Sequence, residues 1–326
     1  MKKILTGVRP TGSLHIGHYL AFIPELLELQ KKYKVFLMIA DLHSQTYPFP
    51  YQPRNLEENV YNLAAEFIAL GVDPKKVLIF RQSAVPAHLS LYWILGCLAS
   101  VGDLERMTQY KEMRERFKDR FTSAGLLMYP VLMAADILIY QPDLIPIGKD
   151  QSQHLEMART LAQRFNHYFG QTFRIPSTYA PKENGQIKSL DEPLKKMAKS
   201  KPAGALFIFE SEKKIEEKIK RAVTDSGSEI LYEPEKKPAI SNLMIIYKAL
   251  TQKTFAEIED EFRNRGYGDF KKALTREFLG FFKKARQRKE SLNKVKINKI
   301  LKTSAKIANK EAVKTLKLVF ERTGLS

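Results

Sequence analysis

Apolar and polar positions follow two different rhythms along the first two hundred residues. Short apolar runs that are typical of buried strands occupy residues 4–8, 35–39, 77–80 and 144–147. Between them, apolar residues recur every three or four positions, which predicts helices over residues 16–32, 56–70, 88–100, 124–140 and 151–169. Strands that alternate with helices indicate an α/β fold with a parallel sheet covered on both faces.

The pattern becomes wholly helical after Pro202. Helical periodicity covers residues 211–223, 240–250, 254–263 and 269–288, and a basic helix follows to the end of the chain. We therefore expect two domains, an α/β domain over residues 1–203 and an all-helical domain over residues 204–326. The sequence leaves open whether the last helix packs back on the first domain.

A His-Ile-Gly-His motif, residues 15–18, stands where the first strand turns into the first helix. A helix N-terminus carries unsatisfied backbone N–H groups and a partial positive charge, so it binds anions readily. His15 and His18 are three residues apart and share a helix face, and Gly17 leaves room for a flat ring to approach the backbone. Two surface histidines or half of a metal site are the alternatives, which the preceding strand and the Pro10-Thr11-Gly12 turn disfavour.

A second motif, Lys-Met-Ala-Lys-Ser, occupies residues 196–200 between Pro193 and Pro202. Two lysines in a short segment bounded by prolines are suited to hold phosphates on a loop. Together the two motifs predict one site that binds the phosphates of a nucleotide from two sides. This prediction requires that segments almost two hundred residues apart converge in the fold.

The last helix adds a one-sided positive charge. The chain has a net charge of +18, and its last 44 residues hold 14 Lys or Arg and 3 Glu, a net of +11. The lysines recur at helical spacing, opposite an apolar face; they are Lys299, Lys302, Lys306, Lys310, Lys314 and Lys317, and the apolar residues are Ile297, Ile300, Leu301, Ile307, Ala308, Ala312, Leu316 and Phe320. Such a stripe is often only a solvated helix face. In a nucleotide-binding protein it favours a nucleic-acid partner.

Composition narrows the class of protein. With 44% hydrophobic residues, the chain has the make-up of a globular protein. Its apolar run near Met1 is too short for a signal peptide or a membrane span, so we expect no membrane partner. The one cysteine, Cys97, excludes an internal disulfide and favours a cytoplasmic location. We interpret Cys97 as core filler near Trp93.

These residues carry a family resemblance. The two motifs resemble the signatures of class I aminoacyl-tRNA synthetases, and the middle of the chain is similar to the bacterial tryptophanyl-tRNA synthetases. The matching stretches include Gly-Asp-Leu-Glu-Arg-Met-Thr-Gln-Tyr-Lys at 102–111, Tyr-Pro-Val-Leu-Met-Ala-Ala-Asp-Ile-Leu at 129–138 and Gly-Lys-Asp-Gln at 148–151. The resemblance implies a Rossmann-like catalytic domain, a helical domain that binds the tRNA anticodon, and a homodimer. It also implies activation of L-tryptophan by ATP and its transfer to tRNA(Trp).

The resemblance further implies roles for individual residues. The pyrophosphate would be stabilised by Lys111, Lys196 and Lys199 together with His15 and His18. Gln151 would bind the ammonium group of the substrate, and His43 would line the amino-acid pocket. ATP would contact Arg9, Pro10, Thr11, Gly17, His18, Gly148, Lys149, Asp150, Ile187, Lys196, Met197, Ala198, Lys199 and Ser200. Asp150 and Gln151 are alternatively mere caps of the helix that follows them. Mg²⁺ is expected with ATP, bound mainly through phosphate oxygens.

Asp136 is the residue that we expect to select the amino acid. It lies among small and apolar neighbours, where an unpaired carboxylate is costly, and an indole N–H is a donor that a carboxylate accepts. Tyr129 and Met133 share its helix face and would wall the ring. The related tyrosine enzymes usually carry glutamine in place of Met133, so the resemblance favours tryptophan. A carboxylate on the helix surface is the alternative interpretation.

Two other functions remain open from the sequence. The first is a class I relative that activates another amino acid, above all tyrosine, whose hydroxyl could also donate to Asp136. The second is a synthetase-like body that only binds RNA or a regulatory partner. The lysines at 111, 196 and 199 disfavour the second, because binding alone does not require a pyrophosphate clamp.

Overall fold

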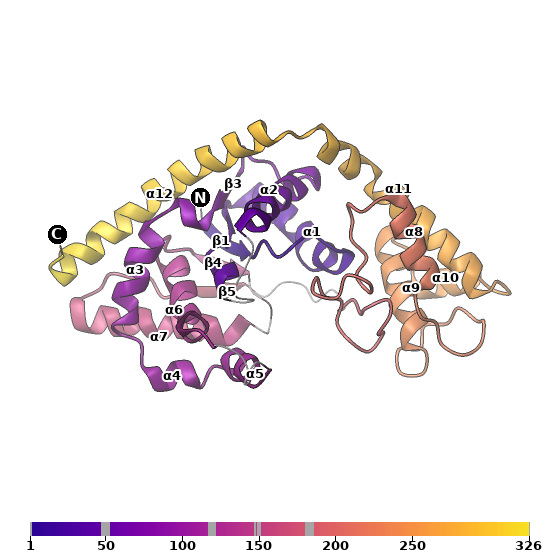
Figure 1. The fold of residues 1–326 in the computed structure, drawn as a ribbon, viewed down its shortest axis with the longest axis horizontal. Coiled ribbons are helices and arrows are strands. Elements are labelled where there is room, and N and C mark those ends of the chain that lie inside the picture. The colour runs from indigo at the N-terminus through magenta and orange to yellow at the C-terminus, as the bar shows by residue number, and fades with distance from the viewer. Residues whose placement is uncertain are drawn as a thin grey trace.

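The computed structural model describes residues 2–46, 53–116, 122–146, 148, 151–179 and 186–325. All of its paired strands run parallel in one sheet with the order β3-β2-β1-β4-β5 (Figure 1). The strands are β1 (Lys3–Val8), β2 (Lys34–Ile39), β3 (Val77–Arg81), β4 (Leu144–Pro146) and β5 (Ser177–Tyr179). Strand β2, which lies between β3 and β1, is almost wholly buried, as its apolar run from Val35 to Ile39 requires.

Two layers of helices cover this sheet. On one face, α1 (Ile16–Lys32) and α2 (Pro53–Ala69) pack on side chains such as Leu37 and Ile79. On the other face, α3 (Ala87–Gly96), α6 (Ala124–Leu138) and α7 (Ser152–Phe169) pack on Phe36 and Phe80. Because successive side chains of a strand point to opposite faces, the sheet contributes to two separate hydrophobic cores. The predicted α/β architecture is confirmed.

The structure departs from the predicted elements chiefly in two places. The polar strand β5 pairs only with β4 and was not predicted. The helix expected over residues 88–100 ends at Gly96, and two short helices follow, α4 (Val101–Glu105) and α5 (Thr108–Arg116). The predicted end of the fourth strand, Ile147, lies outside the described residues.

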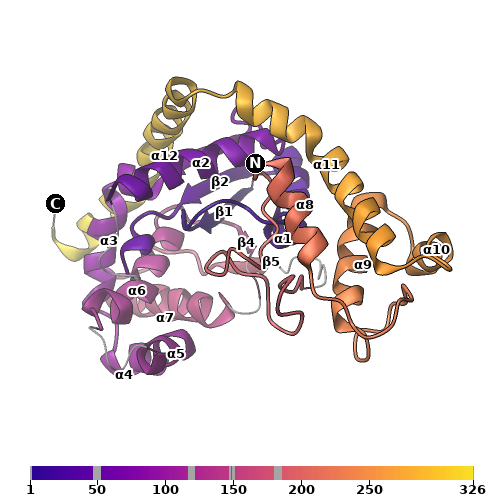
Figure 2. The same cartoon turned by 45° about the vertical axis from the view of Figure 1, so that its right-hand side comes forward.

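The second half of the chain forms a helical layer beside the sheet (Figure 2). It comprises α8 (Glu212–Arg221), α9 (Pro238–Thr251), α10 (Phe255–Glu261) and α11 (Tyr267–Ser291). Buried aromatic rings of α11, among them Phe270 and Phe278, continue the core that α1 and α2 form with the sheet. An ion pair of 2.8 Å between the partly exposed Lys289 of α11 and the buried Glu66 of α2 joins the two parts.

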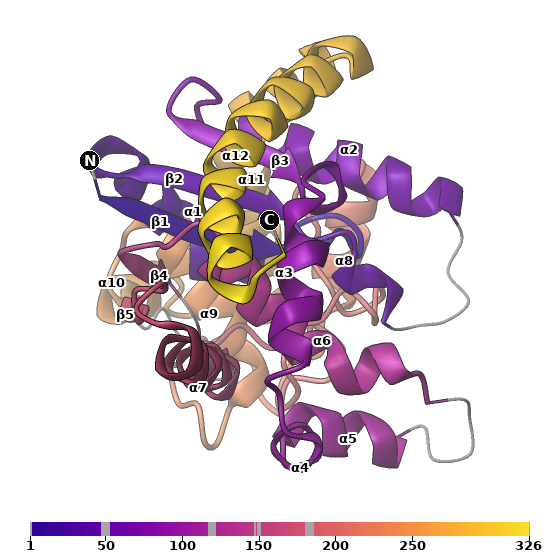
Figure 3. The ribbon, with the colours of Figure 1, turned by 90° about the vertical axis from the view of Figure 1, so that its left-hand side faces the viewer.

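The last helix, α12 (Lys294–Thr323), turns back across the sheet domain and contacts β3, α2 and α3 (Figure 3). Its buried residues Ala308, Ala312 and Val319 belong to the core beneath α3 and α6. All six lysines of its stripe are exposed, whereas Ile307, which we expected on the apolar face, is 41% exposed. Among the described helices, α12 included, none combines the length and the apolar character needed to cross a membrane.

Candidate functional site

The first strand ends in a tight turn that fixes the start of α1. The N–H of Thr11 bonds to the carbonyl of Arg9, and Gly12 follows with a φ of +118°, a conformation that favours glycine. The N–H of Leu14 donates to the fully buried carboxylate of Glu66 at 2.8 Å. A hydrogen bond to α2 therefore fixes the backbone just before the His-Ile-Gly-His motif.

His15 is the N-cap residue of α1. Its Nδ1 accepts a hydrogen bond of 3.3 Å from the N–H of His18, and the two rings lie 3.7 Å apart between centroids. Because Nδ1 accepts, the neutral ring carries its proton on Nε2. That Nε2 and the Nδ1 of His18 are buried and have no partner among the described residues. Each is a polar atom placed to meet a ligand that comes to the helix N-terminus.

Burial keeps both rings neutral. Loss of solvation, aided by the charges of Lys199 and Lys196, lowers the pKa of His15 to about 4. The same loss of solvation, with the neighbouring His15, lowers the pKa of His18 to about 2. At pH 7 the pair therefore offers neutral N–H donors, while the positive charge of the site comes from the lysines.

The segment that carries the second motif packs directly against this helix start. Backbone hydrogen bonds join Ile16 to Leu206 and Leu14 to Ile208. Within the segment, the N–H of Met197 donates to the carbonyl of Ile187 at 3.1 Å, and Met197 is only 2% exposed. The methionine thus anchors the motif in the core and leaves Lys196 and Ser200 exposed on either side.

Lys199 joins the second motif to the turn that immediately precedes the first. Its ammonium group donates a hydrogen bond of 2.7 Å to the carbonyl oxygen of Gly12. Burial is the main cause that lowers the pKa of Lys199 to about 8; the charge of Arg9 lowers it further, and Glu66 opposes the shift. A cation held at this cost of solvation lies ready to bind the negative charge of a phosphate.

Gly17, within the first motif, lies next to Ile187. A Cβ at position 17 would come within 3.1 Å of the His15 ring and 3.5 Å of the Ile187 Cβ. The missing side chain therefore lets the His15 ring and the lysine segment approach α1 together.

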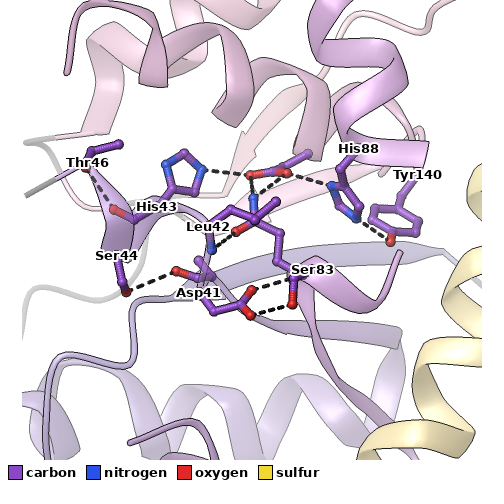
Figure 4. A network of polar contacts seen from close by, with 11 residues as sticks. Asp41, Leu42, His43, Ser44, Thr46, Ser83, His88 and Tyr140 are labelled. Atoms are coloured by element: carbon purple, nitrogen blue, oxygen red, sulfur yellow. Dashed lines mark hydrogen bonds and ion pairs between the residues drawn. The ribbon is translucent and has the colours of Figure 1, made fainter. Parts of the chain in front are cut away.

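Asp136 is the centre of a buried polar cluster (Figure 4) rather than a carboxylate on the helix surface. His43 Nε2 lies 2.9 Å from its Oδ2, and His88 Nδ1 lies 2.6 Å from its Oδ1. The amide nitrogen of Gln82 donates to both carboxylate oxygens at 2.8 and 2.9 Å. Burial raises the pKa of Asp136, but these partners, His43 first, outweigh it and lower the pKa below its ordinary value. The carboxylate is thus an ionised acceptor.

Tyr129 adjoins this cluster on the side of α5. Its ring meets the ring of His43 edge to face at 6.3 Å, and its hydroxyl donates to Gln109 at 3.0 Å and lies 2.7 Å from Nε2 of His154. Burial raises the pKa of Tyr129 to about 12, although the charge of Arg9 lowers it. The charge of Arg9 therefore acts on both Tyr129 and Lys199.

Other expected residues are less closely tied to this centre. Met133 is half-buried on α6, and Gln151 precedes α7 without a capping hydrogen bond from its side chain. Lys111 is exposed on α5, and the described residues show no contact between it and the lysine motif. Gly148 is exposed, whereas Lys149 and Asp150 lie outside the described residues.

Sequence reasoning missed three residues of the Asp136 cluster. Gln82 comes directly after β3, at the edge of a parallel sheet where ligands bind, so its place in the chain gives a signal. His88 and Tyr140 give no such signal, because each is a single polar residue in an apolar helical stretch. Only the packing of α3 against α6 brings them to Asp136.

Comparison with known proteins identifies the family to which the chain belongs. The family described as tRNA synthetases class I (W and Y) matches residues 1–283. The tryptophan–tRNA ligase of Caldanaerobacter subterraneus subsp. tengcongensis is 42% identical over 327 residues, which is 100% of this chain and 99% of that protein. The enzyme of Bacillus subtilis is 41% identical, over 99% of this chain and 97% of that protein.

Solved structures give the same result. A tryptophanyl-tRNA synthetase from Mycoplasma pneumoniae superposes with a TM-score of 0.87 at 33% identity, covering 100% of this chain and 98% of that one. A tryptophanyl-tRNA synthetase from Campylobacter jejuni, complexed with ADP and tryptophan, also gives 0.87, at 34% identity over 99% of both chains. The chain therefore belongs to the class I tRNA synthetases of the tryptophan and tyrosine type and, within them, to the tryptophan–tRNA ligases.

Proposed function

We propose that this chain activates L-tryptophan with ATP and then transfers the tryptophanyl group to tRNA(Trp). The observation that carries the proposal is the hydrogen bond from Lys199 of the second motif to Gly12, in the turn that precedes the first motif. The charge of Lys199 acts on His15 and His18, each of which has a buried ring nitrogen without a partner among the described residues. The nucleotide seen in the Campylobacter jejuni relative supports ATP as the second substrate.

In the first step, a carboxylate oxygen of tryptophan attacks the α-phosphorus of ATP. A P–O bond forms to the amino acid, the bond to the bridging oxygen breaks, and pyrophosphate leaves with the electron pair. The nucleophile is already ionised, so catalysis rests on positioning and on stabilisation of negative charge. Lys196, Lys199 and the N–H of His15 supply that charge stabilisation, and Lys111 reaches the same phosphates from α5.

The nucleotide lies along the turn and the lysine segment. Arg9, Pro10 and Thr11 border the phosphates, Ile187 packs on the adenine, and Gly148 with Asp150 binds the ribose. The groups described here are cations and neutral imidazoles, which suit phosphate oxygens and lack the oxygen ligands that Mg²⁺ prefers. Mg²⁺ therefore enters on the phosphates of ATP.

The indole ring lies between Tyr129 and Met133, with its N–H on the ionised carboxylate of Asp136. His43 borders the same ring, and Gln151 binds the ammonium group. A site built around one buried hydrogen bond can reject an analogue that lacks the donor by about four to five orders of magnitude. Asp136 is ionised and surrounded by donors, which supports this role.

The tRNA contacts the helical domain, residues 204–326, and the lysine stripe of α12. Four of its lysines, Lys299, Lys302, Lys306 and Lys310, form no ion pair with any described residue. Unpaired exposed lysines along one helix are suited to a phosphate backbone.

Two copies of the chain pair through α3 and α4. Trp93 is 71% exposed and Val101 is 60% exposed, and Cys97, which we had interpreted as core filler, is exposed between them. A patch of this kind is typical of a protein interface. We place the homodimer in the cytoplasm, where a free cysteine stays reduced.

The experiment that tests this function is exchange of labelled pyrophosphate into ATP, with tryptophan and tyrosine compared side by side. We expect exchange with tryptophan as the preferred substrate. Preference for tyrosine would reassign the substrate, and absence of exchange with both would favour a protein that only binds RNA.

A further inference from the structure

His88 lies between the buried side chains of Asp136 and Tyr140. Its Nδ1 is 2.6 Å from Oδ1 of Asp136, and its Nε2 is 2.8 Å from the hydroxyl of Tyr140 (Figure 4). His88 is 0% exposed and Tyr140 1% exposed. Both ring nitrogens are therefore used within the protein, so His88 can act on a ligand only through Asp136.

The direction of these hydrogen bonds follows from Tyr140. Burial, together with the charge of Asp136, raises the pKa of Tyr140, so its hydroxyl keeps its proton. That O–H can donate to Nε2 of His88, which leaves the proton of the neutral ring on Nδ1. The Nδ1–H then donates to the carboxylate of Asp136. Tyr140 thereby selects the His88 tautomer that Asp136 requires.

Gln82 fixes the same carboxylate from a third element. The N–H of Leu42 donates to its amide oxygen at 3.1 Å, which orients the amide so that its nitrogen faces Asp136. Donors to Asp136 thus come from α3, from the residues after β3 and, through His43, from those after β2. Because these directions differ, the carboxylate cannot rotate without losing at least one hydrogen bond.

We propose that His88, oriented by Tyr140, is a positioning residue that fixes the Asp136 carboxylate in the direction from which the indole N–H of tryptophan is bound. The inference rests on the proposed function and adds a determinant of amino-acid affinity that does not touch the substrate. A hydrogen bond weakens steeply when its acceptor points in the wrong direction. A misplacement of a binding group by about 1 Å can lower the rate about a hundredfold.

Two substitutions separate positioning from general packing. Asn places an amide nitrogen close to the position of Nδ1, so His88→Asn keeps the donor to Asp136; His88→Leu keeps bulk but removes the donor. We expect His88→Leu to raise the KM for tryptophan on the order of 10- to 100-fold, with the KM for ATP changed by less than about twofold. His88→Asn should restore most of the affinity for tryptophan.

Two results of this comparison would overturn the inference about His88. Equal losses in both variants, or equal rises in the KM for tryptophan and for ATP, would show that His88 only fills the core. If His88→Leu fails to fold, the comparison of His88→Asn with the wild type still decides. The ¹⁵N shifts of His88 in the wild-type protein provide a second test, since a proton on Nε2 instead of Nδ1 contradicts the tautomer. Failure of the proposed function is distinct, because the wild type would then show no exchange with tryptophan.

Discussion

The ammonium group of Lys199 donates a hydrogen bond of 2.7 Å to the carbonyl oxygen of Gly12, a residue 187 positions earlier in the chain. This contact closes the turn before α1 against the lysine segment. It also places a poorly solvated cation beside two neutral histidines. A triphosphate that enters here gains more from Lys199 than it would from an exposed lysine, because the cation has little solvation left to lose.

The pH dependence of ATP use should report the ionisation of Lys199. Its pKa of about 8 in the free protein means that the cation is present below pH 8 and is lost above it. We therefore expect kcat/KM for ATP to fall about tenfold per pH unit above pH 8, because this parameter follows the free enzyme. Lys199→Arg, which stays charged, should not show this fall of kcat/KM above pH 8, even if its activity is lower. A fall at the same pH in the arginine variant would show that another group causes it.

Replacement of Asp136 by Ala should reduce tryptophan activation far more than ATP affinity. The change also leaves buried donors of Gln82, His43 and His88 without an acceptor, so the free energy of unfolding should fall by about 2–5 kcal/mol. Denaturant unfolding and separate KM values for the two substrates measure both effects. Comparable losses for tryptophan and ATP would contradict the assigned role.

The lysine stripe of α12 makes a prediction about salt. Replacement of Lys299, Lys302, Lys306 and Lys310 by Gln should weaken tRNA binding and reduce the slope of log K against log salt by about 0.7–0.9 for each lost phosphate contact. Exchange of pyrophosphate without tRNA should stay unchanged. The same four positions changed to Arg keep their charge and should keep the slope. An unchanged slope in the Gln variant would leave the stripe as a solvated face.

The exposed face of α3 should hold two copies together. Sedimentation of the wild type should give twice the 37.5 kDa mass of the chain, and Trp93→Glu should give the single mass. Val295, which is 80% exposed near the start of α12, provides the control, and Val295→Glu should remain a dimer. Dissociation of both variants, or of neither, would place the interface elsewhere.

The fold was readable from the sequence where local pattern and burial agree. α1 spans the predicted residues because its apolar stripe and its N-cap at His15 both mark its bounds. Strand β5, in contrast, has three residues of which two are exposed, so no apolar run announces it. Helix α5, with the sequence TQYKEMRER, is too polar to show a buried face. Both elements are positioned by their neighbours rather than by their own pattern.

The sequence predicted the phosphate-binding part of the candidate site better than the surroundings of Asp136. The convergence of the two motifs was inferred from their residue types, and the structure joins Lys199 of the second motif to Gly12, in the turn before the first motif. The partners of Asp136 were not inferred, because His88 and Tyr140 reach it only through tertiary packing. Sequence reasoning therefore selected Asp136 as the proposed acceptor for the substrate but not the residues that bond to it.

The exchange of pyrophosphate into ATP by Lys199→Met is the most direct test of the clamp between the two motifs. Lys195→Met is the matched control, since Lys195 lies in the same segment but is exposed and paired with Glu192. We predict a loss of about a hundredfold in the rate for Lys199→Met, with the wild-type rate for Lys195→Met and no loss of stability in either. Exchange at the wild-type rate by a folded Lys199→Met variant would contradict a shared phosphate site.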